Sequence, residues 1–284
     1  MQTLNQVKYL RAALNADKNH GSSIVLVPTM GNLHEGHLQL VRRAREVADI
    51  VVVSIFVNPM QFGASEDLDN YPRTLTEDQD KLDAENVDYL FIPDATEIYP
   101  SGINNHTTVA NPCLSDRLCG LHRPGHFAGV CTIVNKLFNL VQPSVAIFGE
   151  KDFQQLAIIK RMVSDLCMPI DIIGVPTARA HDGLALSSRN QYLNNIDRVK
   201  APIIYDTLQK TREAIAAGSK QYETLCETAK IDLASAGFNV DYFDIRNQDN
   251  LSLLKNNADD TEIVILTAAT LGETRLLDNI RIKI

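Results

Sequence analysis

The sequence lacks long hydrophobic runs, paired cysteines and an excess of basic residues, and each absence excludes a class of protein. Its apolar runs are of strand length, and none approaches the roughly 18 residues of a membrane span, so we expect no membrane partner. The chain begins without a basic stretch followed by an apolar run, so we expect no secretory signal. The net charge is −8, which argues against a nucleic-acid partner because such binders carry a basic face. A nucleotide substrate remains compatible, since a few local cations suffice to hold a triphosphate.

The cysteines are scattered along the chain. They are odd in number and none belongs to a C-x-x-C pair, so we expect neither a disulfide framework nor a zinc site. Reduced thiols are typical of a cytoplasmic protein, which is the location that we predict. The five residues are Cys113, Cys119, Cys131, Cys167 and Cys226.

Familiar nucleotide-binding and nucleophilic motifs are missing too. Neither the Walker G-x-x-x-x-G-K-[ST] loop nor G-x-G-x-x-G occurs, and no Ser-His-Asp or Cys-His arrangement is evident. The composition is otherwise that of a globular protein, with 45% hydrophobic and 22% charged residues. The length of 284 residues allows one large domain or two unequal ones.

Short β-branched runs alternate with amphipathic stretches in the first part of the chain. Runs that are apolar on both faces suit parallel strands covered by helices on each side. The alternation predicts an α/β fold with a doubly wound parallel sheet over residues 1–176. The expected strands are 23–27, 50–57, 88–92, 144–148 and 170–175, and the expected helices are 35–47, 129–141 and 152–166.

The pattern changes near Pro176. Two helical patterns, over residues 197–217 and 222–236, come in succession and are followed by strand candidates at 240–245 and 262–266. Helices followed by strands predict a smaller α+β domain over residues 177–284.

A pair of histidines follows the first predicted long strand. His34 and His37 lie three residues apart, on one side of the first turn of the predicted helix 35–47. We expect them to flank free backbone N–H groups at the positive end of the helix dipole, which suits a phosphate. Solvated helix-start histidines are the alternative. Zinc ligation is disfavoured, because the metalloprotease pattern H-E-x-x-H places its histidines four residues apart.

Polar clusters also follow the other predicted strands, where an open parallel sheet collects its ligands. Lys151, in the string Gly149-Glu150-Lys151-Asp152, is placed to meet phosphate oxygens. The Ser187-Ser188-Arg189 turn offers two hydroxyls and a guanidinium for the β- and γ-phosphates. Neutral amides at Asn58, Gln61 and Gln155 suit a small polar acid because they do not repel its carboxylate. Taken singly, each cluster is also compatible with an ordinary polar loop.

Five strings, in this order, resemble the pantoate–β-alanine ligase (pantothenate synthetase) family. The H-x-G-H string alone indicates only the wider nucleotidyltransferase superfamily, whereas the five together are highly specific. The similarity extends through about residue 195 and is weaker in motif beyond it. The strings are Pro28-Thr29-Met30-Gly31, His34-x-Gly36-His37, the run 56–62, Gly149-Glu150-Lys151-Asp152 and the run 186–190.

The resemblance implies a Rossmann-like N-terminal domain that binds ATP and pantoate, a smaller C-terminal lid domain associated with dimer formation, and a homodimer. It implies a Mg²⁺-dependent reaction in which pantoate and ATP give pantoyl adenylate and pyrophosphate. β-Alanine then attacks the adenylate, giving pantothenate and AMP. The acidic stretch at residues 76–80 either helps to hold Mg²⁺ or is a solvated helix start, so we name no metal ligand.

The resemblance also implies roles for individual residues. Catalysis would involve His34, His37 and Lys151. ATP would be bound by Met30, Gly31, Asn32, Leu33, His34, Glu35, Gly36, His37, Gly149, Glu150, Lys151, Asp152, Ala178, Leu186, Ser187, Ser188 and Arg189. The small substrates would be bound by Gln61, Gln155, Met30 and Asn58, with Arg123 and His126 resembling mobile gate residues. Ala178 departs from the family, where many relatives have a larger apolar residue whose backbone meets adenine.

Two other functions remain open from the sequence. One is a nucleotidyltransferase with a phosphorylated acceptor, which the Gln61 and Gln155 pair disfavours because a phosphate calls for cations. The other is a nucleotide-binding regulator without turnover, which the presence of His34, His37, Lys151 and Arg189 together disfavours.

Overall fold

The computed structural model describes residues 1–63 and 68–283. The chain forms two compact units. The first comprises Met1–Glu150 with Gln155–Pro176, and the second comprises Lys151–Gln154 with Thr177–Ile284. The second unit thus includes a short segment, Lys151–Gln154, that lies in the sequence between the two parts of the first.

The first unit is built on a six-stranded parallel sheet with the order β1-β4-β3-β2-β5-β6. The central strands are buried on both faces, as the continuous β-branched runs predict, and Val25 and Val52 are fully inaccessible. The predicted Rossmann-like, doubly wound fold is confirmed. The strands are β1 Gln2–Leu4, β2 Ile24–Thr29, β3 Ile50–Ile55, β4 Tyr89–Phe91, β5 Val145–Gly149 and β6 Asp171–Val175.

Helices cover this sheet. Helix α2 packs against β2, β3 and β5, where Val41 and Ala44 join a core with Val27 and Val53, whereas α7 contacts β2 and α1. The long helices are α1 Val7–Asn19, α2 Glu35–Val47, α3 Leu75–Ala84, α7 His126–Val141 and α8 Phe153–Asp165. The short ones are η1 Pro59–Gln61, α4 Ala95–Ile98, α5 Pro112–Ser115, α6 Cys119–His122 and η2 Glu150–Asp152.

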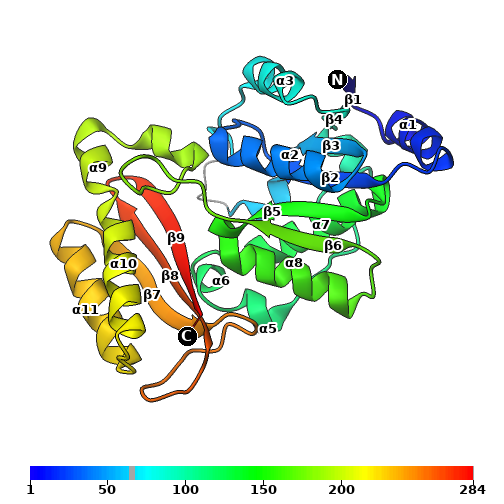
Figure 1. Cartoon of the computed structure of the whole chain (residues 1–284). Helices are drawn as coiled ribbons and strands as arrows, with labels where there is room; N and C mark the ends of the chain where they lie inside the picture. Colours follow the sequence, from blue (N-terminus) through cyan, green and yellow to red (C-terminus); the bar gives the residue numbers. More distant parts are fainter. Residues whose placement is uncertain (64–67, 284) are drawn as a thin grey trace. The chain divides into compact units, whose positions relative to one another are not determined.

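The second unit has an antiparallel sheet with the order β7-β8-β9, formed by Asn239–Asn247, Glu262–Leu271 and Thr274–Lys283. Helices α10 Ile203–Ala216 and α11 Tyr222–Ser235 lie side by side against this sheet (Figure 1). Their apolar residues, including Leu208 and Leu233, form a core with Phe243 and Ile265. The remaining helices of the unit are η3 Ser188–Tyr192 and α9 Asn195–Lys200.

One predicted helix is wrong in this unit. Residues 197–217 do not form a continuous helix, because α9 ends at Lys200 and α10 begins at Ile203. Pro202 lies between them as the N-cap of α10. Proline has no backbone N–H, and its ring clashes with the preceding turn of a helix, so the helix is interrupted there.

Other differences concern elements that the sequence pattern did not reveal. Strands β1 and β9 and helix α1 were not predicted, and β8 continues five residues beyond the predicted strand 262–266, to Leu271. Among the helices of the described residues, none is both long and apolar enough to cross a membrane.

Candidate active site

The sheet of the first unit has a reversal of strand order between β2 and β5. These strands are hydrogen-bonded neighbours, yet the chain continues from β2 to β3 on one side and from β5 to β6 on the other. Ligands of open α/β sheets bind beyond the carboxyl ends of strands at such a point. Thr29 and Gly149 end the two strands, so the segment that starts at Met30 lies at the expected position.

Side chains of helix α3 form hydrogen bonds with the backbone of the loop after β2. The Asp78 carboxylate accepts the backbone N–H of Asn32 at 2.8 Å and that of Leu33 at 2.7 Å. Lys81, one turn later, donates to the Leu33 carbonyl at 2.7 Å. Asp78 is only 1% exposed, so it is not part of a solvated helix start. It anchors the loop backbone, a part that the sequence pattern did not reveal.

Gly31 lets this loop pass close to its anchor. Its φ of +82° lies in the region that favours glycine. A Cβ at this position would lie 3.1 Å from both the Asp78 Oδ2 atom and the Ile55 Cγ2 atom. The turn and the close approach therefore both require the absence of a side chain.

His34 and His37 cap helix α2 reciprocally. The His34 Nδ1 atom accepts the Gly36 N–H at 3.1 Å, and the His37 Nδ1 atom accepts the His34 N–H at 3.3 Å. The two ring centroids are 4.1 Å apart. An Nδ1 atom that accepts a hydrogen bond cannot carry a hydrogen, so a neutral ring carries it on Nε2. Both imidazoles thus have the tautomer with an Nε2–H donor, which suits phosphate oxygens.

The expectation of free backbone N–H groups around these histidines is wrong for four of these groups. The N–H groups of Asn32 and Leu33 donate to Asp78, and those of His34 and Gly36 donate to the imidazoles. An oxygen of an anionic ligand would compete with acceptors that are already in place. The side chains, more than the backbone, are therefore the donors that this segment offers to a phosphate.

A buried amide cluster adjoins the same loop. The Gln61 Nε2 atom lies 3.0 Å from the Met30 sulfur, and its Oε1 atom accepts from Asn58 at 3.2 Å. Asn58 also donates to the Gly129 carbonyl at 3.1 Å, and its Oδ1 atom accepts the Tyr99 hydroxyl at 2.8 Å. Burial raises the pKa of Tyr99 to about 12, so this hydroxyl remains a donor at neutral pH. Tyr99 and Gly129 were not among the predicted site residues.

Arg123 and His126 approach the backbone of the same cluster. The His126 Nδ1 atom lies 2.8 Å from the Gln61 carbonyl oxygen, and its Nε2 atom lies 3.1 Å from Arg123 Nη1. A carbonyl only accepts and a guanidinium only donates, so the ring is neutral with its hydrogen on Nδ1. The structure therefore brings together Met30, Asn58, Gln61, Arg123 and His126. Gln155 lies half-buried on α8, without a hydrogen bond to this cluster among the described residues.

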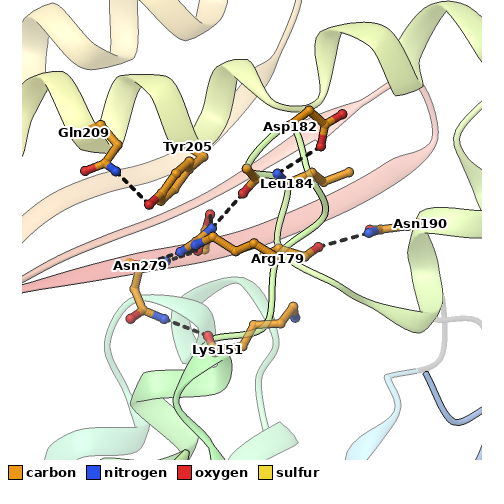
Figure 2. Close-up of polar contacts among 11 residues, drawn as sticks. Lys151, Arg179, Asp182, Leu184, Asn190, Tyr205, Gln209 and Asn279 are labelled. Carbon is orange, nitrogen blue, oxygen red and sulfur yellow. Dashed lines mark hydrogen bonds and ion pairs between the residues drawn. The ribbon is translucent and has the colours of Figure 1, made fainter. Parts of the chain in front are cut away.

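Glu150 belongs to the first unit, and the second unit contains the remaining predicted residues. Ala178 and Leu186 are paired by a backbone hydrogen bond of 2.9 Å across a short hairpin. Ser187 follows this hairpin and caps η3 by accepting the Arg189 N–H at 3.3 Å. The Lys151 ammonium lies 3.8 Å from the Asp152 carboxylate, and its side chain is 21% exposed. The Lys151 carbonyl accepts a hydrogen bond of 2.8 Å from the Asn279 side chain of β9. This bond is drawn in Figure 2.

A protein-derived metal site is not evident. Within residues 1–63 and 68–283, no group of three or more His, Cys, Asp or Glu side chains is placed to hold a metal ion. In the acidic stretch at 76–80, Asp78 already serves the loop backbone.

The parallel sheet with its reversal of strand order and the histidine-capped helix after β2 define a Rossmann-like α/β protein. The model of the pantoate–β-alanine ligase family matches residues 2–281. The chain therefore belongs to the pantoate–β-alanine ligase family, and the resemblance seen in the sequence is confirmed.

Individual relatives agree over their whole length. The chain is 54% identical over 284 residues to the pantothenate synthetase of Ectopseudomonas mendocina, covering 100% of this chain and 99% of the relative. It is 53% identical over 282 residues to that of Pseudomonas savastanoi pv. phaseolicola, covering 99% of each.

Solved structures of the same family also match. Pantothenate synthetase from Thermus thermophilus is 43% identical with a TM-score of 0.91, covering 99% of each chain. Pantoate–β-alanine ligase from Francisella tularensis, solved with a β,γ-ATP compound and β-alanine, is 33% identical with a TM-score of 0.81. That match covers 99% of this chain and 97% of the other.

Proposed function

We propose that this chain is an ATP-dependent ligase that condenses pantoate with β-alanine to form pantothenate. Besides its family membership, one contact carries the proposal. The Met30 sulfur lies 3.0 Å from the Gln61 amide, so the histidine-capped loop and the neutral amide cluster form one continuous site in the first unit. Such a site offers hydrogen-bond donors for phosphates beside neutral amide side chains, which suits a small hydroxy acid.

The reaction proceeds in two steps. A pantoate carboxylate oxygen attacks the α-phosphorus of ATP, and the bond to the bridging oxygen breaks, which gives pantoyl adenylate and pyrophosphate. The β-alanine amine then attacks the acyl carbon; it loses a proton, and AMP leaves. A carboxylate is a poor electrophile until it carries this leaving group. Catalysis therefore depends on positioning and on neutralising charge, and needs no protein nucleophile.

Each predicted residue has a part in this scheme. His34 and His37 donate Nε2–H bonds to the phosphates and stabilise the charge that develops there. Lys151 neutralises charge on the α-phosphate, and Ser187, Ser188 and Arg189 bind the outgoing pyrophosphate. Gln61 and Gln155 bind pantoate through its hydroxyls and carboxylate, with Met30 packed against it. Gly149, Asp152, Ala178 and Leu186 contact the nucleoside, and the other loop residues, Gly31, Asn32, Leu33, Glu35 and Gly36, shape the phosphate side.

The geometry divides the small-substrate residues into two groups. Gln61 and Met30 contact the substrate directly. Asn58 uses its amide hydrogens for Gln61 and Gly129, and its oxygen for the Tyr99 hydroxyl. We therefore assign Asn58 to orienting Gln61. Arg123 and His126 act on the Gln61 backbone from the other side and gate access to the site.

The wider setting follows the family. Mg²⁺ enters with ATP, because this ion is usually held by substrate phosphates and water with few protein ligands. The first unit binds ATP and pantoate, and the second unit acts as a lid that takes part in a homodimer. The enzyme works in the cytoplasm. Light scattering should give about twice the chain mass of 31.5 kDa, and a mass equal to one chain would contradict the dimer.

Isotope exchange between pyrophosphate and ATP tests the proposed reaction most directly. We expect exchange that requires pantoate and proceeds without β-alanine, because adenylate formation is reversible and precedes the amine. Exchange without any acid, or only with a phosphorylated acceptor, would reject the ligase and favour another nucleotidyltransferase. Binding of ATP without any exchange would favour a regulator.

A further inference from the structure

A buried ion pair in the second unit lies next to Lys151 without being part of the proposed chemistry. The Asp278 carboxylate, which is 1% exposed, receives two hydrogen bonds from the Arg179 guanidinium, at 2.7 and 2.9 Å. A bidentate pair of this kind fixes both partners in direction as well as in distance. Burying a carboxylate is costly, and removing one partner of a buried pair is strongly destabilising.

Arg179 is fixed on its remaining sides too. Its Nη1 atom donates to the Gly183 carbonyl at 3.0 Å, and its Nη2 atom donates to the Asn279 carbonyl at 3.2 Å. The face of the guanidinium lies 3.7 Å from the ring centroid of Tyr205, a cation–π contact. The Tyr205 hydroxyl in turn accepts from Gln209 at 2.7 Å. The guanidinium therefore has little freedom to move.

Asn279 connects this pair to Lys151. Its backbone N–H donates to Asp278 Oδ1 at 2.7 Å, and its side-chain Nδ2 donates to the Lys151 carbonyl at 2.8 Å. Asn279 is 5% exposed, so little water competes for that bond. Lys151 follows β5 in a single turn of η2, and a turn that short has few hydrogen bonds of its own to hold it.

Arg179 connects the same pair to the phosphate-binding turn. Its backbone is paired with Ala185 across the hairpin that also pairs Ala178 with Leu186. Ser187 follows this hairpin directly. Burial raises the pKa of the Asp278 carboxyl, whereas the hydrogen bonds from Arg179 and the charge of Lys151 act in the opposite direction. Asp278 thus interacts with both cations.

We propose that Arg179, Asp278 and Asn279 form a positioning network that holds the backbone of Lys151 and the hairpin leading to Ser187. The inference rests on the proposed function, in which both segments contact the phosphates of ATP. The network residues are positioning residues, since they act through Lys151 and the hairpin. A network that only stabilised β9 would have the same contacts, so the test must separate positioning from stability.

A double-mutant cycle makes this separation. Asn279→Ala removes the bond to the Lys151 carbonyl and should slow pantoate-dependent pyrophosphate exchange about tenfold or more, since small displacements of catalytic groups have effects of this size. Lys151→Ala should slow it further. In the double variant, we expect the loss caused by Asn279→Ala to disappear, because no Lys151 side chain is left to position. An equal loss in both backgrounds would overturn the proposal.

Asn247→Ala is the matched control. Asn247 lies in the same sheet and donates one side-chain bond of 2.8 Å, to Asp260, remote in sequence from Lys151. We expect it to lower the unfolding midpoint without slowing exchange. If Asn247→Ala and Asn279→Ala lowered exchange alike, a general loss of stability would account for both, and the positioning role would be rejected.

Arg179→Lys provides a second variant that keeps the charge beside Asp278 but loses the bidentate fork. It should lower kcat of exchange more than it changes KM for pantoate. Retention of full kcat by folded Arg179→Lys and Asn279→Ala enzymes would overturn the network. Absence of pantoate-dependent exchange in the unaltered enzyme would instead reject the proposed function itself, so the two failures are distinguishable.

Discussion

The side chains of His34 and His37 accept hydrogen bonds from the backbone at the start of helix α2. Each Nδ1 atom accepts a backbone N–H of the first turn, which leaves the hydrogen on Nε2. The local structure therefore favours the tautomer with an Nε2–H donor on each ring, which suits the charge stabilisation proposed for them.

Asp78 is the residue on which this arrangement depends most. Asp78→Asn leaves one acceptor oxygen for the two N–H groups of Asn32 and Leu33, and turns an NH₂ group toward one of them. We expect a loss of about 1–3 kcal/mol in the free energy of unfolding, the usual cost of leaving a buried donor unsatisfied. We also expect a higher KM for ATP, because the loop before His34 is released.

The control for this prediction lies on the same helix. Asp80 is exposed, so Asp80→Asn changes the charge equally and should leave both the urea midpoint and the KM for ATP unchanged. If the two variants behaved alike, a change in net charge would explain the effect, and Asp78 would have no anchoring role.

Lys151 should carry a larger share of catalysis than any single residue of the loop. Lys151→Ala removes a full positive charge from the α-phosphate, and the loss of one such donor costs about 3–4 kcal/mol of transition-state stabilisation. We expect the exchange rate to fall by the factor that corresponds to this loss. The free energy of unfolding should change by no more than about 0.5 kcal/mol, because the Lys151 side chain is partly exposed. A near-normal exchange rate would remove Lys151 from the mechanism.

Among the elements, those with a strong local signal could be predicted from the sequence. The helix expected over residues 35–47 is α2 Glu35–Val47, since an apolar stripe and a polar start define it. Strand β9 was missed because its residues alternate weakly, with Arg275, Asp278, Asn279 and Arg281 among apolar ones. Asp278 and Asn279 belong to the buried network beside Lys151. Their presence in the strand depends on tertiary contacts, which a local sequence pattern does not reveal.

The same reasoning applies to the site. Glycines and histidines next to a predicted strand end indicated a loop at the sheet edge, and the structure places the segment that starts at Met30 where the strand order reverses. Asp78 lies more than forty residues from the loop that it anchors, as the hydrogen bonds to Asn32 and Leu33 show. Asn58 was predicted from the sequence to bind the substrate. The orienting role proposed for it rests on its buried hydrogen bonds to Gln61 and Tyr99.

Helix α7 sets the position of η1 through one glycine. A Cβ on Gly129 would lie 2.5 Å from the Met60 carbonyl oxygen and 2.7 Å from the Gln61 nitrogen, both of them backbone atoms. Gly129→Ala must therefore shift η1 away from α7. We expect the KM for pantoate to rise about tenfold or more, since Gln61 moves with η1.

The KM for ATP serves as the internal control for Gly129→Ala, because the loop of Gly31 is anchored independently, by Asp78. Steady-state kinetics with each substrate varied in turn give both constants. A parallel rise in both would indicate a general distortion of the first unit, and an unchanged KM for pantoate would show that η1 does not position the acid.

At the scale of the whole molecule, each unit has a hydrophobic core of its own. One cluster includes Val27, Val41 and Leu90, and the other includes Leu208, Phe243 and Ile265. A substitution in one core should therefore reduce the local stability of that unit first. Residues with proposed roles occur in each unit, so this difference determines which of them a destabilising change affects.

Two matched substitutions test this expectation. Leu90 and Leu208 are both fully buried, and Leu→Ala at such positions costs about 2–5 kcal/mol. In hydrogen exchange followed by mass spectrometry, Leu208→Ala should lower the protection of α10, α11 and β7–β9, while β2, β3 and β5 keep theirs. Leu90→Ala should do the reverse, because protection reports local opening. Equal loss of protection in both units from either variant would show that the chain unfolds as one cooperative body, and the two cores would then have to be treated as a single stability unit.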